Sequence, residues 1–444
     1  MTWWGSLVRV QSRLPITQAL HLNSPMMPPI SHSSVPLEAA ASAPLTGVRV
    51  LDFSRLLPGP YCSQILADLG AEVIRIDDAT RTDGGDLMRE EANLEGFGGG
   101  RFFDLVNRGK KSIALNLRDP RAVEIVKRLV VDVDIVLEGF RPGVMQRLGV
   151  GYETLAALRP SLVFCALSGY GQTGPFRDKA GHDLNYLALS GALHHNREHD
   201  SGPAIGAIQT ADLAGGALTA ATAILAALLD SKLNGRGRFL DVAMADGALA
   251  LNVYALSLLN QHGIEPAAGA ELITGGAACY QVYATQDQRY LAVGALEQKF
   301  WLRFCQILNR PDLIDRGHCC GQEGRAVIAD VAATIAKKTL AQWREIFKDE
   351  DCCVSPVMTL GESLQYGPSV GRSTIALNSE AQPALPFPVP MAASPPSVAS
   401  SPAIGADTEP LLLAKGYTTA EIADLIAEGV VVSYRPVSES SRRR

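Results

Sequence analysis

The sequence lacks an excess of basic residues. Its 444 residues include 40 Lys and Arg against 46 Asp and Glu, which gives a formal net charge of −6 and a sequence pI of about 5.8. Binding to nucleic acid depends on cations that neutralise phosphates, so this balance argues against a nucleic-acid-binding protein.

It also lacks paired cysteine motifs. None of the eight cysteines forms a CxxC pair, and four of them stand as the adjacent doublets Cys319-Cys320 and Cys352-Cys353. Such spacing fits neither a zinc site nor a disulfide framework. We therefore expect free thiols and a cytoplasmic protein.

The sequence also lacks a clear membrane span. The longest uncharged apolar run, residues 213–229, falls short of the roughly 20 residues that cross a bilayer. We expect a buried helix there and no membrane span. The sequence also has no G-x-G-x-x-G fingerprint, because the turn after its first predicted strand is Ser54-Arg55-Leu56-Leu57-Pro58-Gly59-Pro60.

The first 45 residues differ in composition from the rest. Residues 1–36 contain no acidic side chain and have Arg9 and Arg13 as their cations. Three interpretations remain open for residues 1–45: a disordered extension, a start codon placed upstream of Met26 or Met27, and a mitochondrial transit segment. The last would change the predicted location from cytoplasmic to mitochondrial.

From residue 46 the pattern is that of an α/β protein. Apolar strands are predicted at 48–53, 71–76, 112–115, 135–137, 162–167 and 238–242, and helices at 58–69, 120–130, 183–193 and 212–229. This alternation predicts a Rossmann-like large domain with a parallel sheet over residues 46–245. A long loop is expected at 78–107.

The second half predicts a smaller α+β domain. A linking helix within 246–275 leads into a small domain at 276–380, with a hairpin at 279–294 and helices at 296–309, 323–338 and 340–349. A linker at 381–399 follows, and 400–435 is expected to complete the large domain. Its last helix begins with the capping box formed by Thr418 and Glu421.

Two ionisable residues stand at predicted helix starts. His182 follows Gly181 after a glycine-rich loop, and Asp212 follows Thr210-Ala211. Each could be an ordinary helix-terminal residue. Together, facing the same strand ends, they fit paired acid–base work. Glu297 lies near a third helix start, where an acid commonly complements the helix dipole.

Histidines and arginines raise two further questions. His194, His195 and His199 lie in a polar segment with no second ligand motif, so we predict no metal site. An excess of cations surrounds the predicted strand ends and could bind a phosphorylated ligand. The residues are Arg55, Arg75, Arg89, Arg108, Lys110, Lys111 and Arg141. Of these, Arg75, Arg108 and Arg141 enter the predicted binding site.

Long stretches of the chain resemble the family III CoA-transferase (CaiB/BaiF) superfamily, and within it the alpha-methylacyl-CoA racemases. They include GVRVLDFSRLLPGPYCSQILADLGAEVIRID from Gly47, RGKKSIALNLRDP from Arg108, EGFRPGVMQRLGVGYETL from Glu138, LSGYGQTGPFRDKAGHDLNYLALSGAL from Leu167, GRGRFLDVAMADGAL from Gly235 and YLAVGALEQKFW from Tyr290. The resemblance covers residues 46–433. It implies an interlocked homodimer and an acyl-CoA thioester substrate, with no cofactor beyond the CoA that the substrate carries.

The resemblance also implies residue roles. His182 and Asp212 would flank the α-carbon of a 2-methylacyl-CoA, so that one removes the proton and the other returns it to the opposite face of an enolate. Glu297 would pair with the histidine, and the backbone amide of Asp183 would hold the thioester oxygen. Tyr186 would lie near the thioester and Arg141 on the phosphates.

One departure and one alternative accompany the resemblance. The family usually carries a basic residue or proline where this chain has Asp78, which leaves the adenosine 3′-phosphate contact to Arg81 or Arg89. The alternative function is a CoA-transferase in which Asp212 attacks the thioester and forms a mixed anhydride. Transferases generally lack the histidine at position 182 and carry a longer glycine run than Gly275-Gly276.

Overall fold

The computed structural model describes residues 43–89, 100–366, 372, 374–378, 380–389 and 399–434. The predicted N-terminal extension therefore lies outside the described residues, except for its last three positions. Much of the predicted linker at 381–399 lies outside them as well.

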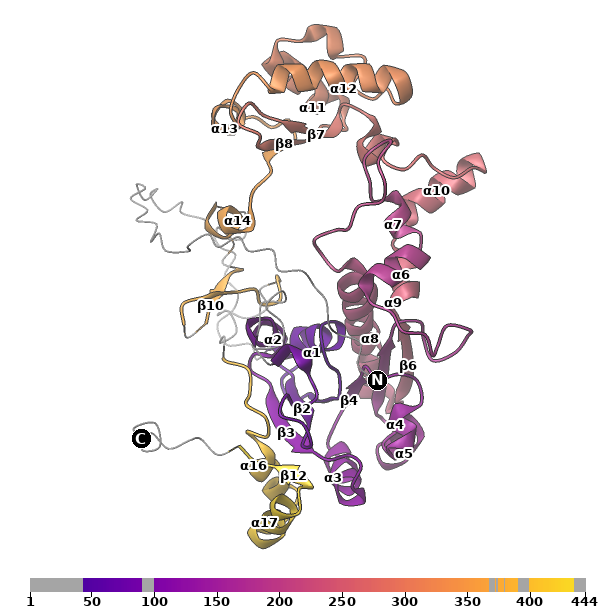
Figure 1. Cartoon of the computed structure of the whole chain (residues 1–444), viewed down its shortest axis with the longest axis vertical. Coiled ribbons are helices and arrows are strands. Elements are labelled where there is room, and N and C mark those ends of the chain that lie inside the picture. Colours follow the sequence, from indigo (N-terminus) through magenta and orange to yellow (C-terminus); the bar gives the residue numbers. More distant parts are fainter. Residues whose placement is uncertain are drawn as a thin grey trace, which may run out of the picture. The chain divides into compact units, whose positions relative to one another are not determined.

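A seven-stranded sheet forms the centre of the large domain (Figure 1). Its strand order is β12-β3-β2-β1-β4-β5-β6, and all neighbouring pairs are parallel except β12 with β3. The strands are β1 (Arg49–Asp52), β2 (Glu72–Asp78), β3 (Lys111–Leu115), β4 (Ile135–Glu138), β5 (Val163–Ser168), β6 (Arg238–Ala243) and β12 (Val431–Val432). The predicted α/β class with a parallel sheet is confirmed.

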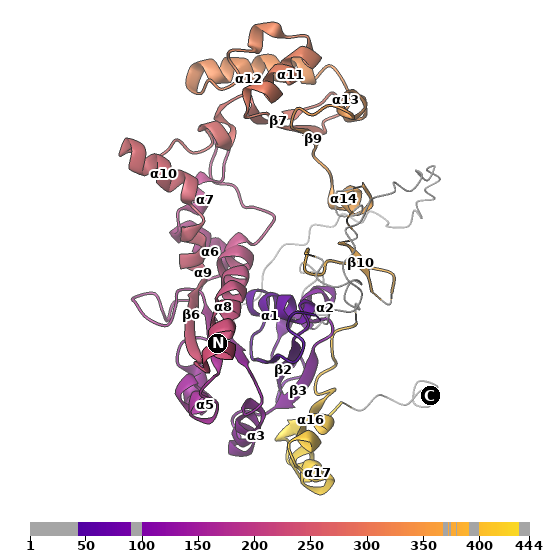
Figure 2. The same ribbon diagram turned by 180° about the vertical axis from the view of Figure 1, so that it is seen from behind.

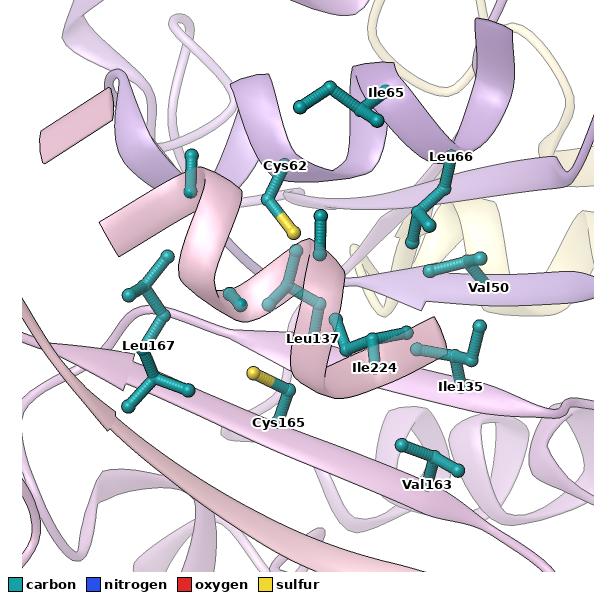
Figure 3. Packing of buried hydrophobic residues seen from close by; sticks show 14 of the residues in the cluster. Val50, Cys62, Ile65, Leu66, Ile135, Leu137, Val163, Cys165, Leu167 and Ile224 are labelled. Carbon is teal, nitrogen blue, oxygen red and sulfur yellow. The ribbon is translucent and has the colours of Figure 1, made fainter. Parts of the chain in front are cut away.

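Helices cover both faces of this sheet. The face that packs on α1 (Pro58–Asp68) and α8 (Thr219–Asn234) receives alternate strand residues such as Val163 and Cys165. The intervening Phe164 belongs to the opposite core, with α3 (Pro120–Val130), α5 (Tyr152–Leu158) and α17 (Thr419–Ala427). Figure 3 shows Ile224 of α8 among the buried side chains of the first core. Successive residues of each strand are buried on opposite faces of the sheet, which explains why these strands are apolar throughout.

The apolar segment at 213–229 lies within a longer helical run. An eight-residue π-helical stretch (Ala211–Leu218) continues into α8, so the run extends to Asn234. By length and composition these 24 residues could cross a membrane. Their buried residues, which include Ala217, Ala220 and Ile224, pack in the first core, as expected for a core helix.

The smaller domain has its own sheet and core. Strands β7 (Tyr280–Ala284), β8 (Tyr290–Gly294) and β9 (Val354–Pro356) are antiparallel neighbours, which confirms the predicted hairpin. Helices α11 (Gln298–Leu308), α12 (Gly321–Ile335) and α13 (Leu340–Phe347) pack on it through Trp301, Phe304 and Trp343. The Thr339 capping box starts α13, with the Gln342 N–H 3.3 Å from the Thr339 hydroxyl.

The C-terminal segment joins the large domain. Helix α16 (Thr408–Ala414) and α17 lie beside β3 and β12, as both views show (Figures 1 and 2). The Thr418 and Glu421 capping box is present, with the Glu421 N–H 3.2 Å from the Thr418 hydroxyl. The remaining short elements are η1 (Leu87–Arg89), α4 (Val144–Arg147), η4 (Leu272–Gly276), η5 (Pro311–Leu313), α14 (Leu360–Tyr366), β10 (Ala376–Leu377) and β11 (Pro383–Ala384).

Three predicted elements differ from the structure. The predicted loop at 78–107 contains a helix, α2 (Gly100–Asn107), which buries Phe103. The predicted helix 183–193 is two helices, α6 (Asp183–Leu189) and α7 (Ala192–His195), because Gly191 adopts a left-handed φ of 82°. The predicted linking helix within 246–275 breaks into α9 (Met244–Ala250) and α10 (Val253–His262), where the Asn252 amide donates to the Ala248 and Leu249 carbonyls.

Candidate active site

The glycine-rich loop after β5 leads the chain to His182. The Gly171 N–H donates to the Ser168 hydroxyl at 3.0 Å, and Gly171 adopts a left-handed φ of 82°. The buried ring of Tyr186 lies so close that a Cβ at Gly169 would come within 2.6 Å of it. Glycine is required there because only its missing side chain leaves room for the tyrosine.

His182 caps α6 with an extended backbone. Its N–H donates to the Asn185 side-chain oxygen at 3.0 Å, and its imidazole is exposed. The Tyr186 hydroxyl donates to the carbonyl of Gly181 at 2.5 Å, which fixes the residue that precedes the histidine. The loop and the helix start therefore hold His182 at the protein surface.

Asp212 lies beside the same helix start. The Asp183 carboxylate accepts the Asp212 N–H at 3.0 Å, which joins the first turn of α6 to the first turn of the π-helical segment. Burial, with the nearby Asp183 charge, raises the pKa of Asp212 to about 7. Burial also raises the pKa of the Tyr186 hydroxyl, and the charges of Asp212, Tyr170 and Asp183 raise it further. A carboxyl with this pKa can both accept and donate a proton at neutral pH.

Close packing of glycines holds the π-helical segment in place. A Cβ at Gly247 of α9 would lie 1.9 Å from the Gly215 carbonyl oxygen, and one at Gly215 would lie 2.7 Å from the Ala248 nitrogen. The two helices therefore touch through their backbones. Single π-helical turns occur frequently at functional sites, and this one carries Asp212 in its first turn.

Glu297 lies in the smaller domain. It is the exposed N-cap of α11, and its charge contributes to the raised pKa of the Cys353 thiol, which burial chiefly causes. Within the described residues, no hydrogen bond or ion pair links Glu297 to His182 or Asp212. A single chain thus brings together His182, Asp212, Asp183 and Tyr186, but not Glu297.

The predicted phosphate-binding arginines have different surroundings. Arg141 is exposed in the turn after β4. Arg75 is 1% exposed, and its guanidinium donates to Asn107, Asp77 and Asp86 at 2.8–3.3 Å. This buried placement does not support the predicted contact between Arg75 and CoA.

Arg108 is also buried. It pairs with Asp68 and donates to the carbonyl of Leu385 at 3.3 Å. Burial lowers the pKa of Arg108, while the Asp68 charge raises it. Its contacts are structural, and its predicted contact with CoA likewise finds no support in this placement.

Comparison with known proteins identifies the family. The model of CoA-transferase family III matches residues 45–411. The chain belongs to CoA-transferase family III. It is 34% identical over 402 residues to the alpha-methylacyl-CoA racemase of Homo sapiens, which covers 88% of this chain and 98% of that protein.

This family III protein is also similar to a CoA-transferase and to a solved structure. It is 35% identical over 329 residues to the succinyl-CoA:glutarate CoA-transferase of Mus musculus, which covers 71% of this chain and 72% of the relative. Its fold matches the crystal structure of a CAIB/BAIF family protein from Brucella suis with a TM-score of 0.72 at 24% identity, over 84% and 100% of the two chains. Both a racemase and a transferase are therefore among the similar proteins.

Two contacts of this family III site were not predicted from the sequence. The resemblance implies a role for the Asp183 backbone amide, whereas the structure also gives the Asp183 carboxylate a hydrogen bond from the Asp212 N–H. The Asp241 carboxylate accepts the Gln172 N–H at 3.0 Å and fixes the glycine-rich loop. No local pattern signals either contact, because the partners lie 29 and 69 residues apart.

The histidines beyond α6 gain a neighbour that was not predicted. His194, His195 and Glu265 place possible ligand atoms within 4.8 Å of one another, and His195 Nε2 lies 3.2 Å from Glu265 Oε1. However, the Arg197 guanidinium lies 3.4 Å from His194 Nε2, where its charge opposes a bound cation. The group is a polar cluster at the surface, and within the described residues it shares no hydrogen bond or ion pair with Asp212.

Proposed function

We propose that this family III protein interconverts (R)- and (S)-2-methylacyl-CoA thioesters by proton transfer between two bases, His182 and Asp212. The observation that carries the proposal is the half-buried Asp212 carboxyl. Its pKa is raised to about 7, and the backbone N–H of the same residue donates to the Asp183 carboxylate, at the helix start that presents His182. Neither group is a nucleophile in this reaction.

The chemistry requires groups that exchange protons near neutral pH. An imidazole does so by its nature, and a carboxyl does so when its environment raises its pKa. One group removes the α-proton of the thioester, the thioester becomes an enolate, and the other group returns a proton to the opposite face. The two groups then exchange roles for the opposite enantiomer. The protein supplies this chemistry with its own side chains and needs no cofactor beyond the CoA of the substrate.

The enolate oxygen needs a preorganised donor. First-turn N–H groups of a helix have no partner within the helix, and Asp183 is the first residue of α6. Its N–H is therefore our candidate for the thioester oxygen, as the resemblance implies. Such donors are effective because they face the charge that develops in the transition state.

The alternative is a CoA-transferase with Asp212 as nucleophile, which the similarity to the succinyl-CoA:glutarate enzyme supports. A nucleophilic carboxylate must be ionised, and so must a carboxylate that removes an α-proton, so the raised pKa of Asp212 does not separate the two reactions. The alternative leaves His182 without a role, which makes racemisation the stronger proposal.

We further propose that the protein acts as a homodimer. Helix α10 has no buried residue in the single chain, and its Val253 and Leu256 are 71% and 54% exposed. Apolar faces of this kind usually pack against a partner. A second copy would cover α10, and Glu297 of the partner subunit would complete the site that one chain leaves without its glutamate.

Proton exchange tests the proposal directly. The protein is incubated with (S)-2-methylacyl-CoA in deuterated water without an acceptor acid, and the α-position is followed by mass spectrometry and chiral analysis. We expect deuterium incorporation together with loss of optical activity. The absence of exchange, combined with transfer of CoA to an added carboxylic acid, would instead establish the transferase.

A further inference from the structure

The large-domain sheet has a switch point between β1 and β4. From β1 the chain builds outward through β2 and β3 on one side, and β4, β5 and β6 extend the sheet on the other. In open parallel sheets, ligands bind beyond the carboxyl ends of the strands at such a point. The turns that leave these two strands carry Arg55 and Arg141.

Arg55 is held over an aromatic ring at this point. Its guanidinium carbon lies 5.2 Å from the centre of the Phe140 ring. The Glu138 carboxylate accepts the Phe140 N–H at 2.7 Å, and the Asp86 carboxylate accepts the N–H of Leu56 at 3.3 Å. Both the ring and the backbone that follows Arg55 are thus fixed by buried acids.

Among the described residues its guanidinium forms no ion pair, although the charges of Asp78, Asp86 and Asp77 act on it from nearby. The Nε atom is buried without a hydrogen-bond partner. The other arginines of this region are engaged. Arg75 pairs with Asp77 and Asp86, Arg81 with Asp83, and Arg89 with Asp77.

The loop beside Arg55 is built to approach the guanidinium. A Cβ at Gly85 would lie 2.6 Å from its central carbon, and Gly85 has a left-handed φ of 82°. Asp86 and Asp77 face Arg75 and Arg89, which leaves Asp78 as the nearby carboxylate without such compensation. Asp78 is occupied by the N–H and hydroxyl of Thr80, at 2.9 and 2.7 Å.

We propose that Arg55 binds a phosphate group of the CoA moiety at the β1/β4 switch point. The proposal rests on an acyl-CoA substrate, as in the proposed function. A guanidinium is planar, and one held over a ring presents its N–H donors from a fixed position, which suits paired hydrogen bonds to phosphate oxygens. CoA offers both a diphosphate and a ribose 3′-phosphate for this contact. Asp78, at the end of β2, opposes the phosphate, since it brings a like charge close to Arg55.

Calorimetric titration of the full chain with free CoA, 3′-dephospho-CoA and pantetheine tests the assignment. We expect Arg55→Met to weaken CoA binding by roughly 10- to 100-fold, the usual range for a lost charged hydrogen bond, with pantetheine unaffected. A loss confined to CoA identifies the 3′-phosphate, whereas an equal loss for dephospho-CoA identifies the diphosphate. Asp78→Asn should tighten CoA binding.

Arg128→Met is the matched control. Arg128 also lies over an aromatic ring, 4.6 Å from the centre of Tyr417, but in the last turn of α3. It should leave CoA binding unchanged. Unchanged CoA binding by folded Arg55→Met, or an equal loss for pantetheine, would overturn the inference. Because free CoA carries no acyl group, either result stands whether or not the protein exchanges the α-proton.

Discussion

Two aspartates of the large domain have pKa values that are shifted in opposite directions. Asp52, at the end of β1, accepts hydrogen bonds from Ser54 and Ser63 and faces the Lys110 ammonium at 3.4 Å. Burial raises its pKa, but Lys110, Arg75 and the two serines more than offset this and hold it below its usual range. Asp212 has a second carboxylate, Asp183, as its neighbour, and its pKa rises to about 7.

The difference shows that burial alone does not decide whether a carboxyl is charged. Asp52 is fully enclosed and ionised because cations and hydroxyl donors replace the lost water. Asp212 is less buried, yet its environment favours the protonated form because burial and the Asp183 charge raise its pKa and no cation of the described residues offsets them. The first arrangement stabilises the fold, and the second prepares a group for proton transfer.

The largest expected effect comes from removing the Asp212 proton site. Asp212→Asn should reduce interconversion of the (R)- and (S)-thioesters by roughly 10²- to 10⁴-fold, the scale of a general acid–base contribution, while the protein stays folded. The measurement is the loss of optical activity of a single enantiomer of 2-methylacyl-CoA, with circular dichroism as the test of folding. Asp178→Asn, at an exposed aspartate, is the control. Near-normal interconversion by Asp212→Asn would refute the two-base assignment.

The next effect comes from removing the cation that compensates Asp52. Lys110→Met should lower the free energy of unfolding by about 3–5 kcal/mol, because it leaves a buried charge without its partner. Urea denaturation measures the change. The neighbouring Lys111→Met is the matched control, since Lys111 forms an exposed ion pair with Glu72 and should cost less than about 1 kcal/mol. Equal losses for the two lysines would contradict the role given to Lys110.

A smaller effect should follow from neutralising Asp183. Asp183→Asn keeps an oxygen that can accept the Asp212 N–H but removes the charge that raises the pKa of Asp212. The apparent pKa in the pH profile of exchange should therefore shift downward. Asp212→Asn supplies the reference, because its pH profile should lack the change in rate that the titration of Asp212 causes. An unchanged profile in Asp183→Asn would leave burial as the sole cause of the raised pKa.

The same pKa has a consequence for stability. A carboxyl whose pKa is higher in the folded protein contributes stability that is fully present below about pH 4 and is lost as the pH rises toward 7. Relative to Asp212→Asn, the unmodified protein should therefore lose stability across this window. Urea denaturation at several pH values would show it. A parallel pH dependence in both proteins would contradict the shift.

The smallest expected effect is that of a chelator. If a divalent cation compensated Asp212 and Asp183, its removal would change the protonation of Asp212 and the exchange rate. We expect dialysis against EDTA to leave exchange unchanged, because the proposed chemistry uses only side chains and the substrate. A loss of activity that a divalent metal restores would contradict this expectation and would show that a cation near Asp212 offsets its charge, as Lys110 does for Asp52.

Local sequence predicted most of the large domain. Each apolar strand run is close to a strand of the structure, and the capping box at Thr418 starts a helix where expected. The predicted loop that contains α2 was wrong, because the short amphipathic run around Phe103 lies among glycines and charges. Period and capping are local signals, so they can be recognised without tertiary information.

The candidate site was predictable to a lesser degree. The motifs around His182 and Asp212 marked both residues, and their position at two neighbouring helix starts that face the strand ends indicated that they would lie together. The arginines were less predictable. Arg75 and Arg108 look like phosphate ligands in sequence but pair with Asp77, Asp86 and Asp68 inside the protein. Which arginines are engaged depends on partners that are distant in sequence.

The sequence by itself determined the parallel sheet, the family and the ionisable residues at the two helix starts, because each depends on hydrophobic period or on a contiguous motif. Only the tertiary structure decided the acidity of the carboxyl at one of these helix starts, Asp212. The pKa of Asp212 depends on burial and on Asp183, and that of Asp52 depends on Lys110 and Arg75. Electrostatic free energy is set by distances and by solvent exclusion, and folding fixes both.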